Sequence, residues 1–507
     1  MLSFFGHSGS RRSEWTGWAV FLLASVVVML SCGMGPRCLA ANRGVPAVKE
    51  TSASTVDEPR RGDEVGVRMI AGRELDEAKR VLGPAADYVI YINWDAFRRD
   101  YYDWANEGGA PGTPNLNRLA SMGALFKAAH NGFPSITNPM QTTIVTGAWP
   151  VVHGNIYRYY DVAGNIVRGA GRTCEAETIA EAAADSGLST ASVQQFMLNG
   201  RGTDGNDPMH LYIQPGGRFE ERVAEAVKII KGEAVRTQSG KTVTSAEIPR
   251  FMAIYGDDLD AAGHNSGAGY GAGISFTYDQ WKAKMVRELV RMDAALGTLI
   301  HALTEVGIME RTAIIITADH GMTPYWGSSS LPDLVRVLQT LGYKPKALAT
   351  DQKAPAGTDV VLVGTGISVQ AYFRRQLGPD EYRSVVEAIS AQPYVGGCLT
   401  RDALDQLGAH KLSGDLVVWP SPPHHFASIN ITFGLGGNHD TYHESSRNVF
   451  LLVSGAGVKH GVTFDHPVEI IDVAPTISKL LGIRPPAQAT GRVLEEALLA
   501  PDESQAR

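Results

Sequence analysis

The chain has 507 residues, of which 44% are hydrophobic and 20% are charged. These values are ordinary for a globular protein with a sizeable core, so extensive disorder is not expected. The net charge is −7 without any Lys/Arg run, which excludes a nucleic-acid scaffold because binding a polyanion needs a clustered basic face. A small anionic substrate held by metal ions is compatible with this charge.

The N-terminal segment predicts export. Arg11 and Arg12 form a positive region, residues 18–31 form an apolar core, and residues 38–40 resemble a small-residue cleavage site. We therefore expect residues 1–40 to be a signal peptide and the protein to be periplasmic or secreted. A retained anchor is the alternative, and no other membrane contact is expected.

Polar residues dominate the stretch that follows. Residues 41–85 contain Pro, Ser, Thr and mixed charge, as is typical of a linker, and residues 86–500 are expected to form the catalytic domain. Cleavage after residue 40 leaves Cys174 and Cys398, whose surroundings have no metal-ligand spacing. They are either one disulfide or two separate thiols.

Strands and helices alternate along the folded region. In chain order, the patterns predict a strand at 88–94, helices at 115–122 and 175–186, a strand at 250–256, a long helix at 278–306, and strands at 313–317 and 448–453. This alternation predicts an α/β fold with a mostly parallel central sheet and helices on both faces.

The alternation loosens between residues 323 and 436. Short strands are predicted at 359–363 and 368–373, and a helix at 382–390. We expect this interval to be a smaller α+β cap region inserted into the main fold.

Thr137 lies where a strand-like approach gives way to a short helix. Asn138 is predicted to be the N-cap, Pro139 suits the first helical position, and Gly147 ends the helix. The Thr137 hydroxyl then faces the positive end of the helix, where backbone N–H groups bind phosphate-like oxygens and favour an alkoxide. An ordinary helix start after a Phe-Pro turn is the alternative.

Asp and His residues follow two of the predicted strands. Asp95 directly follows the strand at 88–94, and Asp319 and His320 follow the strand at 313–317. Ligands of open parallel sheets bind beyond the carboxyl ends of the strands, so these side chains are expected at one site. Taken alone, Asp95 is equally typical of a residue that caps a turn.

Further candidate ligands lie nearer the C-terminus. Asp260 and His264 have the spacing that places a carboxylate and an imidazole on one side of a helical turn, although such a pair is often only a surface contact. His439 lies in a glycine-rich loop at 436–440. The rival ligands nearby are Asp257, Asp258, His424, His425 and His443.

Oxygen and imidazole ligands without thiolate suit Zn²⁺, with Mn²⁺ or iron as alternatives. This number of ligands can hold two ions, and paired ions at roughly 4 Å clamp the attacking and leaving oxygens of phosphoryl transfer. We therefore expect two zinc ions. The expected ligands are Asp95, Thr137, Asp260, His264, Asp319, His320 and His439.

These motifs, in this order, resemble the alkaline phosphatase superfamily, and within it the nucleotide pyrophosphatase/phosphodiesterase and phosphonoacetate hydrolase branch. The resemblance extends over residues 88–496. It rests on Asp95, Thr137-Asn138-Pro139, Ile144-Val145-Thr146-Gly147, His153-Gly154, Asp260-x-x-Gly263-His264, Asp319-His320-Gly321-Met322 and Asn438-His439.

The resemblance implies a two-zinc site with a threonine nucleophile. Thr137 would attack phosphorus and form a phosphothreonyl intermediate that water then hydrolyses, whereas His153 would be structural. One zinc would be held by Asp95, Thr137, Asp319 and His320, and the other by Asp260, His264 and His439.

The departures from the family pattern concern the substrate. Phosphodiesterase relatives bind a phosphoryl oxygen through an Asn after the His-Gly pair, but the stretch here is one residue shorter, and Asn155 or Arg158 is the candidate substitute. With Asn138, these are the candidate substrate-binding residues. Phosphonoacetate hydrolases use two lysines that residues 192–196 lack.

The expected function is hydrolysis of phosphodiester or pyrophosphate bonds in a small phosphate ester. The alternative is a phosphomonoesterase or phosphonate hydrolase, for which Arg158 or Arg201 would supply a positive side chain. A non-catalytic metal-binding protein is a third hypothesis. The sequence does not indicate the oligomeric state.

Overall fold

The computed structural model describes residues 85–500 except 268 and 430. The predicted signal peptide, and the predicted linker up to residue 84, lie outside these residues. Within the described part of the chain, no helix has both the length and the apolar character needed to cross a bilayer.

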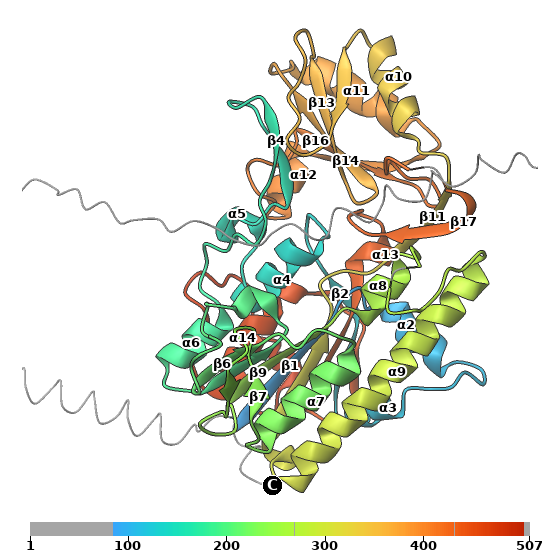
Figure 1. The fold of residues 1–507 in the computed structure, drawn as a ribbon. Coiled ribbons are helices and arrows are strands. Elements are labelled where there is room, and N and C mark those ends of the chain that lie inside the picture. The colour runs from blue at the N-terminus through green and yellow to red at the C-terminus, as the bar shows by residue number, and fades with distance from the viewer. Residues whose placement is uncertain (1–84, 268, 430, 501–507) are drawn as a thin grey trace, which may run out of the picture. The chain divides into compact units, whose positions relative to one another are not determined.

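A nine-stranded sheet forms the centre of the fold (Figure 1). Its strands are β1 (Tyr88–Trp94), β2 (Gly123–His130), β5 (Thr190–Val193), β6 (His210–Ile213), β9 (Phe251–Gly256), β10 (Thr312–Thr317), β18 (Asn448–Gly455), β19 (Val462–Phe464) and β20 (Val468–Glu469). The order is β19-β2-β18-β10-β1-β9-β5-β6, with β20 also paired to β2. Because β1 and β10 are buried almost throughout, they read as continuous apolar runs.

The sheet is parallel from β10 to β6, as predicted, and β19 and β20 also pair parallel with β2. Strand β18 runs antiparallel to both β10 and β2. The sequence analysis missed β2, whose outward-facing Lys127 and half-buried His130 interrupt the apolar run.

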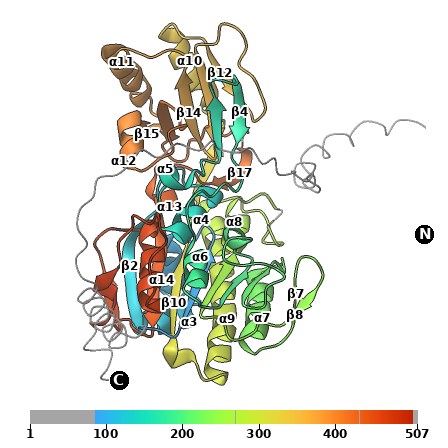
Figure 2. The same ribbon diagram turned by 90° about the vertical axis from the view of Figure 1, so that its left-hand side faces the viewer.

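Helices cover both faces of the sheet (Figures 1 and 2). On one face, α9 contacts the shorter helices α2, α3 and α7; on the other, α14 contacts α4 and α6. The first group is α2 (Arg99–Asn106), α3 (Pro114–Ser121), α7 (Phe219–Ile230) and α9 (Tyr278–Glu305). The second is α4 (Thr137–Thr146), α6 (Ile179–Asp185) and α14 (Val473–Leu481). Helix α6 begins later than predicted because Thr178 and Glu181 form a capping box there.

A second sheet has its own apolar core. Its strands are β12 (Pro345–Leu348), β13 (Val360–Thr365), β14 (Ser368–Phe373), β15 (Val395–Thr400) and β16 (Leu416–Pro420), in the order β12-β13-β14-β16-β15. Its helices are α10 (Leu331–Thr340), α11 (Pro379–Ser390) and α12 (Arg401–Gln406). Leu334, Leu362 and Ile389 belong to this core.

A short ladder forms where the chain passes between the main fold and the second sheet. Strand β11 (Thr323–Gly327) pairs with β17 (Ile431–Asn438), and Thr323 lies opposite Asn438. The chain therefore leaves and re-enters the main fold at neighbouring points, which supports the proposal that residues 323–436 are one inserted cap.

A small hairpin packs against the second sheet. It consists of β3 (Arg158–Asp161) and β4 (Ile166–Gly169), and its Tyr160 shares an apolar cluster with Tyr372 of β14. This packing places Arg158 beside the turn that joins β13 to β14. The remaining elements include α5 (Pro150–His153), α8 (Asp258–Gly263), α13 (Glu444–Arg447), β7 (Val235–Arg236) and β8 (Thr242–Val243).

Candidate active site

A first cluster of acidic and imidazole side chains lies at the carboxyl ends of β1 and β10. Asp95, Asp319 and His320 are buried, and each offers a ligand atom within 4.8 Å of the others. His320 Nε2 lies 3.2 Å from Asp95 Oδ1 and 3.8 Å from Asp319 Oδ2. The parallel pairing of β1 with β10 brings the two strand ends to the same edge.

The Thr137 hydroxyl borders this cluster. Its Oγ1 lies 3.0 Å from His320 Nε2. Thr137 is the first residue of α4 and Ile136 is the N-cap, so the prediction that Asn138 caps this helix was wrong. The Asn138 amide instead donates to the Gly171 carbonyl at 3.1 Å. Gly147 ends the helix with a φ of 65°, as predicted.

A second cluster joins the end of α8 to the end of β17. Asp260, His264 and His439 also offer ligand atoms within 4.8 Å of one another. Asp260 Oδ1 lies 3.3 Å from His264 Nε2 and 3.9 Å from His439 Nε2. The spacing of Asp260 and His264 predicted that the two side chains share one side of a helical turn, and in the structure that side faces His439.

The two clusters adjoin each other. The rings of His320 and His439 stack with centroids 3.8 Å apart and an interplanar angle of 17°. All the predicted ligands therefore lie at one place in the fold. That they bind metal stays a prediction.

Backbone carbonyls fix the orientation of the three imidazoles. Each Nδ1 faces a carbonyl oxygen, at 2.8 Å for His320, 2.9 Å for His264 and 3.1 Å for His439. When Nδ1–H donates to the carbonyl, the lone pair of Nε2 points into the site, which is the arrangement of a metal-binding histidine.

The carboxylates of Asp95 and Asp260 also have the arrangement expected of metal ligands. Among the described residues, Asp95 Oδ1 and Asp260 Oδ1 are buried without a hydrogen-bond donor. Buried acceptors that face imidazole lone pairs are costly unless a cation lies between them. The donor set of carboxylate oxygen and imidazole nitrogen therefore fits divalent cations such as Zn²⁺.

The electrostatics are those of a site that needs positive charge. Burial raises the pKa of Asp95 well above its ordinary value, and the charges of Asp319 and Asp260 raise it further. Burial lowers the pKa of His439 well below its ordinary value, and His320 lowers it further. A divalent cation would reverse the shift of Asp95, because it favours the ionised carboxylate, and would act in the same direction as the shift of His439, because it favours the neutral imidazole.

Supporting residues that the sequence analysis missed hold the carboxylates. The Gln141 amide donates to Asp319 Oδ2 at 3.0 Å and to Asn93 Oδ1 at 2.8 Å. The Tyr255 hydroxyl donates to Asp95 Oδ2. The only signal in the sequence was Asn93, a polar residue inside an otherwise apolar strand.

Asp440 links the loop of Thr137 to that of His439. Its Oδ1 accepts from the Ser135 N–H at 3.0 Å, and its own N–H donates to the Ser135 carbonyl at 2.9 Å. The same carbonyl faces His439 Nδ1. Asp440 is fully buried and holds a φ of 61°, which Asp and Asn tolerate better than most residues.

A cavity of about 390 Å³ opens beside the second cluster. Its lining includes His264, His439 and Arg158. Asn155 is fully buried instead, and its amide donates to the Thr173 carbonyl at 3.0 Å. Of the three candidate substrate-binding residues, only Arg158 lines this cavity.

The rival ligands have other partners. Asp257 pairs with Arg222 at 2.7 Å, and Asp258 accepts from the Phe219 N–H at 2.9 Å. His425 packs against Tyr325. Among the described residues, none of these rivals, nor His424 or His443, belongs to a group with metal-ligand geometry.

Arg201 was predicted as a possible substrate-binding cation, and Cys174 and Cys398 as either one disulfide or two separate thiols. Arg201 pairs with Glu181 at 2.7 Å and donates to the Ala176 carbonyl at 2.6 Å, so its guanidinium is already engaged. Cys174 and Cys398 are both free thiols.

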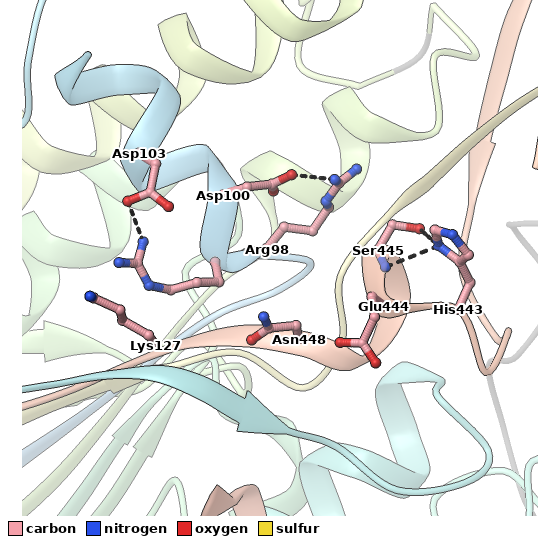
Figure 3. A pocket seen from close by; sticks show the side chains of 9 residues that line it. Arg98, Asp100, Asp103, Lys127, His443, Glu444, Ser445 and Asn448 are labelled. Atoms are coloured by element: carbon pink, nitrogen blue, oxygen red, sulfur yellow. Dashed lines mark hydrogen bonds and ion pairs between the residues drawn. The ribbon is translucent and has the colours of Figure 1, made fainter. Parts of the chain in front are cut away.

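A second cavity, of about 330 Å³, has a lining that includes Arg98, Asp103 and His443 (Figure 3). Figure 3 shows Arg98 paired with Asp100, and His443 against Ser445. Its charged side chains largely neutralise one another, and it has no group of metal ligands among the described residues. The chemistry therefore favours the cavity beside His439.

Comparison with known families decides the assignment. Residues 89–428 match the family described as type I phosphodiesterase / nucleotide pyrophosphatase. The chain belongs to this family. The predicted family and fold class are thereby confirmed, and family membership also agrees with a metal-dependent hydrolase.

Curated relatives of the type I phosphodiesterase family match part of the chain. Ectonucleotide pyrophosphatase/phosphodiesterase family member 3 from Rattus norvegicus is 28% identical over 244 residues, or 46% of this chain and 25% of the rat protein. Bis(5'-adenosyl)-triphosphatase ENPP4 from Bos taurus is 25% identical over 256 residues, or 46% of this chain and 47% of the bovine protein. The match thus spans between a quarter and a half of these relatives.

Solved structures show the same fold. Murine ectonucleotide pyrophosphatase / phosphodiesterase 5 superposes with a TM-score of 0.56 at 16% identity, covering 81% of this chain and 100% of the murine chain. An inactive variant of the murine protein in complex with AMP gives a TM-score of 0.55 at 16% identity, covering 79% of this chain and 96% of the other.

Proposed function

We propose that this protein hydrolyses phosphodiester or pyrophosphate bonds of small phosphate esters, with Thr137 as the nucleophile. The observation that carries the proposal is the position of Thr137 Oγ1, 3.0 Å from His320 Nε2 at the edge of the paired clusters. Family membership and the AMP bound to the murine relative support a nucleotide-like substrate.

The side chains divide into two metal-binding sets. Asp95, Asp319, His320 and the Thr137 hydroxyl would hold one divalent cation, and Asp260, His264 and His439 the other. Zn²⁺ suits these donors best, with Mn²⁺ or iron as alternatives. Such ions, when bound, supply positive charge that favours the threonine alkoxide and neutralises the phosphate oxygens.

The chain's own groups then carry the reaction. The Thr137 hydroxyl gives up its proton to solvent and Oγ1 attacks phosphorus; the Oγ1–phosphorus bond forms, and the leaving oxygen departs with the electron pair of the bond that breaks. Water hydrolyses the phosphothreonyl group and restores the hydroxyl. The N-terminus of α4 directs its backbone N–H groups toward the phosphoryl oxygens, which stabilises their negative charge.

Substrate binding is proposed for Asn138, Asn155 and Arg158. Arg158 reaches the cavity directly. Asn138 and Asn155 both donate to the Gly171 carbonyl, at 3.1 and 3.5 Å, so each would have to exchange that bond for a phosphoryl oxygen.

A phosphomonoesterase is the second candidate. It is favoured by Arg158, because the dianion of a monoester gains from an additional positive side chain. Rates on bis-p-nitrophenyl phosphate and p-nitrophenyl phosphate, measured with zinc-loaded protein, separate the two functions. Hydrolysis of neither ester would contradict both.

Export through residues 1–40 is also part of the proposal. Its test is the N-terminal sequence of the protein recovered from the periplasm or the medium of the producing cells. Recovery only from the cytoplasm would contradict it.

A further inference from the structure

Three buried amide side chains are joined by hydrogen bonds that end at Asp319. Asn93, Gln141 and Gln195 are fully buried, and they come from separate parts of the fold. Asn93 lies in β1 and Gln141 in α4, whereas Gln195 is the N-cap of the short 3-10 helix η1 (Phe196–Leu198) that follows β5. A buried amide without partners costs free energy, so the partners of each amide decide which way its oxygen and its nitrogen point.

Gln141 turns its amide nitrogen toward Asp319. Nε2 donates to Asp319 Oδ2 at 3.0 Å and to Asn93 Oδ1 at 2.8 Å. Both hydrogens of this nitrogen are thereby used, so Oε1 of Gln141 points the other way and needs a donor of its own. That donor is Nε2 of Gln195.

The backbone in turn fixes the direction of Gln195. Its side-chain oxygen accepts from the Met197 N–H at 3.3 Å, and its backbone carbonyl accepts from the Ser192 hydroxyl at 3.0 Å. Because Oε1 of Gln195 faces a backbone donor, its Nε2 is the atom that faces Gln141. The turn after β5 therefore decides which end of the Gln141 amide reaches Asp319.

The reverse orientation of Gln141 would place oxygen against oxygen. Its Oε1 would then face Asp319 Oδ2 and Asn93 Oδ1, and its Nε2 would face the nitrogen of Gln195. The other oxygen of Asp319, Oδ1, accepts from the His320 N–H at 3.0 Å. A donor on each oxygen stabilises the negative charge of a carboxylate, and such a charge binds a cation more strongly.

We propose that Gln195 is a positioning residue for the cation that Asp95, Asp319 and His320 would hold. It fixes the direction of the Gln141 amide, and this amide stabilises the Asp319 carboxylate. The inference rests on the proposed function and deepens it, because it adds a residue that contacts none of the candidate ligands. Gln195 acts only through Gln141, and this relation distinguishes it from a residue that merely fills the core.

The test measures zinc affinity by competition with a chromogenic chelator. Gln195→Met keeps the length of the side chain and removes the donor. The affinity of one of the two expected ions should fall about 3- to 10-fold, as expected for loss of one hydrogen bond between neutral groups, and the affinity of the other should stay unchanged. His264→Ala, which removes a ligand of the other cluster, identifies the binding step that belongs to Asp319. Unaltered affinity in Gln195→Met would overturn the inference.

A double-mutant cycle tests whether Gln195 acts through Gln141. Once Gln141→Ala has removed the amide, adding Gln195→Met should weaken zinc binding no further, because no amide is left to orient. A second loss of the same size in the double variant would overturn the inference, since Gln195 would then act on the site by another route.

Gln194→Met is the matched control. Gln194 is the neighbouring glutamine, and its Oε1 accepts from the Gly216 N–H at 3.0 Å instead of serving Gln141. This variant should leave both zinc affinities unchanged. A loss equal to that of Gln195→Met would show that any change in this turn disturbs the site, which would overturn the specific role of Gln195.

A measurement on unmodified protein does not depend on how the variants fold. In NMR spectra, zinc should shift the side-chain amide resonances of Gln141 and Gln195 more than those of Gln194, because a charge at Asp319 polarises the joined amides. Unshifted resonances of Gln195 would overturn the inference. Failure of unmodified protein to bind zinc would contradict the proposed metal-binding sets instead, and zinc-loaded protein that hydrolyses no phosphate ester would contradict the proposed function while the role of Gln195 stands.

Discussion

Thr137 Oγ1 lies 3.0 Å from His320 Nε2, although 183 residues separate them in the chain. One residue begins helix α4, and the other follows strand β10. The pair joins a helix N-terminus to a candidate metal ligand, and both features favour an alkoxide.

Replacement of Thr137 tests the nucleophile. Thr137→Ala should lower kcat at least about 1,000-fold, because no hydroxyl is left to form the phosphothreonine, while the bound zinc changes little. Steady-state kinetics and elemental analysis measure the two quantities. Thr340→Ala, at an exposed position of α10, is the control. Near-normal turnover by Thr137→Ala would exclude a covalent intermediate.

Gln141 is predicted to orient Asp319. Gln141→Ala removes the donor to Asp319 Oδ2 and to Asn93, so zinc affinity should fall about 10- to 100-fold. A competition titration with a chromogenic chelator measures this affinity. Gln339→Ala, at an exposed position of α10, should leave the affinity unchanged. An unaltered affinity in Gln141→Ala would argue against the supporting role.

Asp440 is predicted to hold the loop of Thr137 in position. Asp440→Ala loses the acceptor for the Ser135 N–H and should lower kcat about 100-fold with less effect on KM. Asp440→Asn keeps an acceptor oxygen and tolerates the positive φ, so it should recover most of the activity. Similar losses in the two variants would show that charge, not hydrogen bonding, matters at this position.

Protonation of the buried His153 is expected to lower the stability of the fold in acid. Burial lowers the pKa of His153 from 6.5 to about 3, and its ring bridges the Thr143 hydroxyl and the Asn155 N–H. The folded state favours the neutral form of His153. The contribution of His153 to the free energy of unfolding is therefore complete above pH 6.5 and falls as the pH drops toward 3. The slope is about 1.4 kcal/mol per pH unit.

The comparison is between unmodified protein and His153→Gln, which cannot take up a proton. Denaturant unfolding between pH 7.5 and pH 4 should show a difference in free energy of unfolding that shrinks or reverses in acid. A constant difference over this range would mean that His153 does not titrate as its burial predicts.

Removal of metal should destabilise the fold. Without cations, the buried carboxylates of Asp95 and Asp319 repel each other, and Asp95 Oδ1 has no donor. Ligand-linked stability of about 4 kcal/mol is expected at a thousandfold excess of ion over its Kd. The Tm of chelator-treated protein should therefore fall by several degrees and recover with Zn²⁺. Recovery with Mg²⁺ to the same extent would count against ligation by the three imidazoles.

Much of the fold was predictable because its strongest signals are local. The largely apolar strands β1 and β10 and the long amphipathic helix α9 were found within one or two residues of their bounds. Strand β2 was not found, because a strand of mixed character owes its place to pairing with β18, far away in the sequence.

The candidate ligands were predictable for a different reason. Asp95, Asp319 and His320 were noticed because they follow apolar strands, although Asp95 taken alone is equally typical of a residue that caps a turn; the set of ligand types together indicated one site. Gln141 and Asp440 were not, because their roles depend on contacts across 178 and 305 residues of sequence. Such partners emerge only when the chain is folded.

The β11–β17 ladder has a mechanical consequence. It begins three residues after His320 and ends one residue before His439. The ladder therefore connects the second sheet to both candidate ligand clusters at once. Movements of that sheet would change the spacing of the two proposed metal-binding clusters together, so a part of the protein that supplies none of the proposed ligands is placed to govern turnover.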